Sequence, residues 1–193
     1  MSKSDFLAKI IRVVSIPPLM VIWLLLVLAL KRPDIFSQPS EIFLCFLMLG
    51  VVPILAYPLQ MLIPALKKGG RDNQRKLAFV LSLVGYTAAL IWSILAQTAI
   101  EIKLICLTYF ISVVILTIFN KLFHIKASGH ACSFTGPLIF FVYLVDWKLI
   151  IPCLISAVLV IWSSLHLKRH SLKDLSFGIL TCLLAFVIAR LIY

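Results

Sequence analysis

Residues 101–119 read EIKLICLTYFISVVILTIF, and this stretch decides the fold class. After Lys103 it carries no charged side chain, and crossing the hydrocarbon core of a bilayer takes about 17–25 mostly apolar residues. Backbone polar groups in lipid must be satisfied within the segment, and the run lacks the alternation of a barrel strand. The stretch is therefore predicted to be a membrane-spanning helix.

The whole chain has the same character. Its 193 residues are 63% hydrophobic and 13% charged, with a mean hydropathy of +1.13, whereas soluble domains are about 45–50% apolar. Seven spans are predicted, at about residues 13–30, 41–66, 77–97, 101–119, 131–146, 148–165 and 174–193. No internal repeat or long linker divides them, so we expect one all-α, polytopic transmembrane helical bundle over residues 1–193.

The first apolar run and the cysteines do not change this interpretation. The run follows MSKSDFLAKIIRVV and is not succeeded by a small-residue cleavage site, so we expect a retained helix. The five cysteines are scattered without CxxC spacing and are expected to be small core residues.

The net charge of +11 is explained by membrane topology better than by nucleic-acid binding, because the basic residues lie in short loops. With seven spans, 13 of the 18 Lys and Arg residues fall on the N-terminal side of the membrane and 5 on the other. The excess predicts that the N-terminus faces the cytoplasm, in the cell (inner) membrane.

Three polar segments interrupt the apolar sequence, at residues 67–76, 120–130 and 166–174. An even number of predicted crossings separates each from the next, so all three emerge on the N-terminal side. Segments far apart in the sequence are thereby predicted to converge on one site.

The second segment supplies Ser128, Gly129 and His130 just before a predicted helix. A helix N-terminus offers unpaired N–H groups and partial positive charge, which suit a phosphate group. Gly129 allows close approach of the backbone, and His130 could donate a proton to a leaving group. The alternative is structural, with Ser128 as an N-cap and His130 an interfacial polar residue.

The third segment places His166, His170 and Asp174 four residues apart, close to one face of a predicted helix. A carboxylate can orient an imidazole and leave its other nitrogen as nucleophile or base. The alternative is an ordinary basic cytoplasmic helix end.

The first segment is cationic and contains Lys67, Lys68, Arg71, Arg75 and Lys76. Arginine forks and lysine point charges bind phosphate oxygens, so this loop is a candidate phosphoryl clamp. Topology alone would also explain such a loop.

Together the segments give K-x6-R at Lys68 and Arg75, S-G-H at 128–130, and S-x6-H-x3-D from Ser163 to Asp174. This order resembles the type 2 phosphatidic acid phosphatase superfamily over roughly residues 67–178. Its motifs are K-x6-R-P, P-S-G-H and S-R-x5-H-x3-D.

The resemblance implies a lipid phosphatase without metal or other cofactor, acting through a phosphohistidine. His170 would attack phosphorus, Asp174 would orient it, and His130 would protonate the leaving oxygen. The phosphoryl oxygens would be held by Lys68, Arg75 and the backbone of Ser128 and Gly129. The expected partners are membrane lipids and a lipid phosphate such as phosphatidate, phosphatidylglycerophosphate or a polyprenyl diphosphate. The oligomeric state is left open.

Three positions depart from the family motifs. Lys76 and Ala127 stand where the family has proline, and Ser164 stands where it has a phosphate-binding arginine. Arg71 or Arg169 is a candidate replacement for that arginine.

Two other functions compete with hydrolysis. The first is a non-catalytic lipid-phosphate binding or transport protein with a degenerate site. The second is a metal site, for which the candidate ligands are His124, His130, Cys132, His166, His170 and Asp174.

Overall fold

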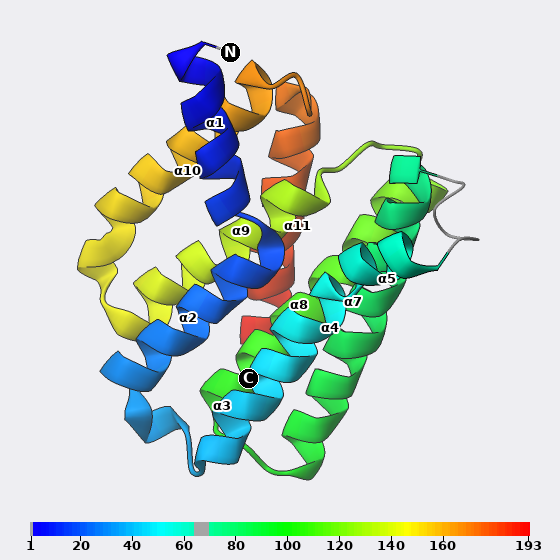
Figure 1. Ribbon diagram of the computed structural model, residues 1–193. Coiled ribbons are helices and arrows are strands. Elements are labelled where there is room, and N and C mark those ends of the chain that lie inside the picture. Colours follow the sequence, from blue (N-terminus) through cyan, green and yellow to red (C-terminus); the bar gives the residue numbers. More distant parts are fainter. Residues whose placement is uncertain (1, 64–69) are drawn as a thin grey trace.

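The structure is a computed structural model that describes residues 2–63 and 70–193, and every regular element in these two ranges is helical (Figure 1). The α-helices are α1 (Lys3–Val14), α2 (Pro17–Lys31), α3 (Pro39–Cys45), α4 (Val52–Ile54), α5 (Ala56–Leu62), α7 (Gly70–Leu95), α8 (Ile100–Thr117), α9 (Gly129–Phe140), α10 (Ile150–His166) and α11 (Leu172–Ile192). One-turn π-helical segments continue α3, α8 and α9, over Phe46–Val51, Ile118–Leu122 and Phe141–Val145. The 3₁₀ turns are Pro33–Ile35 and Trp147–Leu149.

The apolar helices confirm a membrane protein, with fewer clear spans than the sequence predicts. Within the described residues four helices are long and apolar enough to cross a membrane: Asn73–Leu95, Ile100–Leu122, Trp147–His166 and Leu172–Ile192. The count rises to six if each of two bent pairs forms one span. The predicted fifth span corresponds to Gly129–Val145, a shorter apolar helix.

The N-terminal region differs most from the prediction of one span over residues 13–30. It forms two helices bent by 60°, because Ser15 ends α1 and Pro17 begins α2. Ser2 and Asp5 form a capping box at the start of α1. This short helix packs on α10, where Ala8 is fully buried.

The second and third predicted spans also change. Residues 39–62 form two apolar helical parts that are bent by 40° at Leu55, and they are one of the two bent pairs that count as a span only if both parts cross together. The end predicted at residue 66 lies outside the described residues. Helix α7 begins at Gly70, so Arg75 lies on a helix and not in the loop that was expected.

The core of the bundle is built around α8, which packs on both α7 and α11. Fully buried Leu24, Cys106 and Phe140 belong to its largest hydrophobic cluster. Helix α11 also packs closely on α9, where a methyl group added to Gly178 would collide with the Ser128 carbonyl. This close crossing fixes the start of α9 against α11.

The described parts of the three polar segments meet at one end of the bundle. Figure 1 shows the starts of α1 and α7, the α8–α9 connection and the α10–α11 connection at the same end, at the top of the view. The topology therefore brings residues from distant parts of the sequence to one place, as the pattern of spans predicted.

Candidate functional site

A cavity of about 650 Å³ opens at this end of the bundle. Its lining includes two imidazoles and five cationic side chains, namely His130, His170, Arg12, Arg75, Lys121, Lys126 and Arg169. No Asp or Glu is part of the described lining. An anion such as a phosphoryl group suits this concentration of positive charge.

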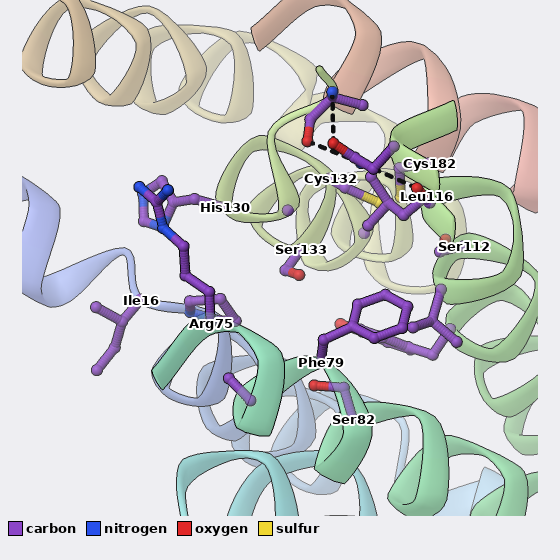
Figure 2. Close-up of a pocket in the computed structure, with 18 of the residues that line it drawn as sticks. Ile16, Arg75, Phe79, Ser82, Ser112, Leu116, His130, Cys132, Ser133 and Cys182 are labelled. Carbon is purple, nitrogen blue, oxygen red and sulfur yellow. Dashed lines mark hydrogen bonds between the residues drawn. The ribbon is translucent and has the colours of Figure 1, made fainter. Parts of the chain in front are cut away.

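Arg75 enters the cavity from α7. Phe79 and Ser82 follow it at i+4 and i+7, so the three share one face of the helix (Figure 2). Of the other predicted cations, Arg169 lines the same cavity, in the α10–α11 connection. Lys68 and the side chain of Arg71 lie outside the described residues.

The S-G-H motif forms the start of α9, as predicted. The Ser128 hydroxyl accepts a hydrogen bond from the N–H of Ala131 at 3.2 Å, and the Ser128 N–H donates to the Asp174 carbonyl at 2.9 Å. Ser128 is fully buried and acts as a helix cap that ties α9 to α11. Gly129 and His130 line the cavity. The first N–H groups of a helix have no acceptor within that helix, so those of α9 lie beside the cavity without an intrahelical partner.

The connection before α9 is held by Asn120. Its side-chain oxygen accepts from the N–H of Ala127 at 3.2 Å, and its side-chain nitrogen donates to the Ala127 carbonyl at 3.2 Å. Lys126, next to Ala127, places its Nζ 3.1 Å from Asp174 Oδ2. The loop therefore delivers a cation to the carboxylate beside His170.

His170 and Asp174 lie together, although not on one helix with His166. Helix α10 ends at His166, and α11 begins at Leu172, so the expectation of a shared helical face is wrong. Asp174 caps α11 in a capping box with Ser171, and its Oδ2 lies 3.8 Å from Nδ1 of His170. That distance is beyond a hydrogen bond but within reach of a small side-chain movement.

His166 points away to a different partner. Its Nε2 lies 2.9 Å from Asp5 Oδ1, and its ring stacks on Trp162 with ring centroids 5.2 Å apart. His166 thus attaches α1 to α10 and does not belong to the cavity lining.

Burial and neighbouring cations disfavour the protonated form of His170. Burial lowers the pKa of His170 below its usual value, and the charge of Arg12 lowers it further. Asp174 opposes these effects, while Lys126 and Arg75 add to them. The ring is therefore neutral at pH 7, which is the form in which an imidazole nitrogen is nucleophilic.

Sequence reasoning missed three members of this region. Arg12 and Lys126 had been counted only as topology-determining charges, and Ser15 had not been singled out. The Ser15 hydroxyl lies 3.3 Å from Nε2 of His130. An amphipathic pattern over residues 3–14 could have indicated that this segment is a helix separate from the apolar helix that follows, with a polar face toward the site.

Ser164, which replaces the family arginine, is fully buried in α10 and does not line the cavity. The arrangement of the described side chains does not support the alternative of a metal site. Among the side chains that the structure describes, no three His, Cys, Asp or Glu side chains cluster as metal ligands would.

No protein-family model, curated protein or solved structure matches the chain.

Proposed function

We propose that the chain is a membrane lipid phosphatase that hydrolyses a lipid phosphate or diphosphate through a phosphohistidine intermediate. One observation carries the proposal: His130 and His170 line the same cationic cavity, and Asp174 stands beside His170. An acid, a nucleophile and anion-binding groups are the parts that phosphoryl transfer to an enzyme nucleophile requires.

In the first step Nε2 of His170 attacks phosphorus, because Nδ1 faces Asp174. The bond between phosphorus and the leaving oxygen breaks as His130 gives that oxygen a proton. Burial and the charge of Arg12 lower the pKa of His130 to about 3, so this proton comes from a singly protonated phosphate group, which passes it to His130 on binding. Arg75 and Arg169 hold the phosphoryl oxygens as charge moves onto them. Asp174 moves closer and stabilises the positive charge that forms on the imidazole ring.

In the second step water attacks the phosphohistidine. His130, now neutral, takes a proton from that water, the bond between phosphorus and nitrogen breaks, and inorganic phosphate leaves. The N–H groups at the start of α9 face the phosphoryl oxygens throughout both steps. Each role belongs to a residue of this chain, so the reaction needs no further reactant besides water.

A lipid substrate is supported by an apolar groove beside the cavity. The groove, about 400 Å³ in volume, is lined by Ile16, Ile54, Tyr57 and Pro58. Ile16 and Tyr57 line the cationic cavity as well, so the two spaces adjoin. An acyl or prenyl chain fits the apolar groove while its phosphate occupies the cationic cavity.

One observation favours a second candidate, a lipid-phosphate binding protein without turnover. Asp174 Oδ2 is engaged by Lys126 and the N–H of Ser171, and it stays 3.8 Å from His170. The family arginine is also missing at Ser164. Such a site would bind the phosphate but would orient its nucleophile poorly.

Phosphate release from a lipid panel separates the two candidates. Purified protein is given phosphatidate, phosphatidylglycerophosphate and a polyprenyl diphosphate in detergent, with His170→Ala as the blank. Release from at least one lipid by the wild type, and from none by the variant, supports hydrolysis. Tight binding of a lipid phosphate without release from any of them supports the binding protein.

A further inference from the structure

Helix α1 lies outside the region that carries the three motifs, yet its last turn lines the cationic cavity through Arg12. We propose that Arg12 is a phosphate-binding residue that completes the site from the N-terminal helix. The inference rests on the proposed function, since it assigns a ligand of the same phosphoryl group.

The position of Arg12 is fixed from both ends of α1. Near its start, Asp5 pairs with His166 of α10 at 2.9 Å. After its last turn, the Ser15 hydroxyl donates to the carbonyl of Arg12 at 3.3 Å and lies 3.3 Å from His130 Nε2. These contacts, with the buried Ala8 between them, hold the Arg12 backbone beside the proposed acid.

The charge of Arg12 already acts on the reacting group. After burial, it is the largest influence that lowers the pKa of His170, ahead of Lys126 and Arg75. Arg12 and His170 also line the same cavity, so the guanidinium borders the space that the phosphoryl group would occupy. Its planar fork can donate two hydrogen bonds to phosphate oxygens.

Position 164 cannot supply this cation, because Ser164 is fully buried in α10 and lies outside the cavity lining. Arg169 lines the cavity from the α10–α11 connection, whereas Arg12 reaches it from a separate helix. The proposed anion site therefore receives arginines from α1, α7 and the α10–α11 connection.

The test measures binding of inorganic phosphate to purified full-length protein by calorimetry, which does not require turnover. Arg12→Gln is expected to weaken binding about 10- to 100-fold, because one charge-assisted pair is lost. Lys3→Gln removes the same charge from the exposed first turn of α1 and is expected to bind phosphate like the wild type. Equal affinities for Arg12→Gln and Lys3→Gln would overturn the inference.

A second measurement on the wild type avoids any folding defect of the variant. Phenylglyoxal modification of Arg12, mapped by mass spectrometry, is expected to slow when inorganic phosphate is present. Modification of the exposed Arg190 is expected not to change. No protection of Arg12 at saturating phosphate would also overturn the inference.

The outcomes separate this inference from the proposed function. Arg12-dependent phosphate binding without lipid hydrolysis would leave the inference intact and refute catalysis. Lipid hydrolysis with Arg12-independent phosphate binding would do the reverse. A wild type that neither binds phosphate nor releases it from lipids would refute both.

Discussion

The crossing of α9 and α11 at Gly178 gives a test of the site's architecture that does not depend on function. A methyl group at position 178 would collide with the Ser128 carbonyl, lie 2.9 Å from Ala131 Cβ and lie 3.2 Å from the Cys132 nitrogen. Two of these three atoms belong to the backbone, so a side-chain rotation cannot relieve the clash. Gly178→Ala must therefore push the start of α9 away from α11.

Overpacking a close-packed core typically costs about 1–3 kcal/mol, and we expect the upper half of that range because backbone must move. At about 2–4 °C for each kcal/mol in a chain of this size, the melting temperature should fall by roughly 4–12 °C. The shift should also stretch the hydrogen bond between the Ser128 N–H and the Asp174 carbonyl, which aligns His130 with His170. Phosphate release should fall with stability.

The assay is thermal unfolding in detergent, followed by tryptophan fluorescence. Gly50→Ala is the matched control, because an added methyl there would meet its nearest atoms at 3.8 and 3.9 Å, which is ordinary contact. We expect the control to melt at or above the wild-type temperature, since alanine favours a helix over glycine. If Gly178→Ala melts with the control, the described crossing of α9 and α11 is wrong.

Three further predictions concern the site. Because the pKa of His170 is lowered, its neutral form persists below pH 6.5. The acid limb of the pH profile of kcat/KM, corrected for substrate ionisation, should therefore lie below that pH. An acid limb above pH 6.5 would contradict a neutral nucleophile. Gly129→Ala should fold normally, since no atom lies within 4 Å of the added methyl group. It should bind inorganic phosphate about tenfold less tightly, a loss of about 1.4 kcal/mol in binding free energy, because the methyl group hinders approach to the N-terminus of α9. Unchanged affinity would show that the N-terminus of α9 does not contact the phosphate. Single cysteines at Gly70 and Lys173, in a chain lacking the native five, should react with an impermeant thiol reagent only after cell lysis; labelling in intact cells would place the site on the outer face.

Much of the helical architecture could be predicted from hydrophobic runs, and the ends of helices could not. Residues 101–119 and 174–193 were recognised as spans because uninterrupted apolar sequence of that length has few alternatives. The bend at Ser15 and the helical start of α7 at Gly70 were missed. The bend arises inside an apolar run, where Pro17 begins a new helix, and α7 begins in polar sequence, so hydropathy marks neither helix end.

The candidate site shows a similar division. Motif spacing brought Arg75, His130 and His170 together correctly, because the topology of the helices places them at one end. It did not find Arg12, which reaches the cavity through the packing of α1 on α10. Nor did it show that the Ser128 N–H donates to the Asp174 carbonyl. Such contacts between distant segments arise from packing, which has no local pattern in the sequence.

A search for phosphate on His170 during turnover tests the phosphohistidine mechanism directly. Protein mixed with radiolabelled lipid phosphate is quenched in alkali, in which phosphohistidine survives, and its peptides are mapped. A phosphohistidine mechanism predicts acid-labile label on the peptide that contains His170, more of it in a slowly hydrolysing variant such as His130→Ala, and none in His170→Ala. Lipid hydrolysis with no label on His170, or with undiminished hydrolysis by His170→Ala, would contradict it.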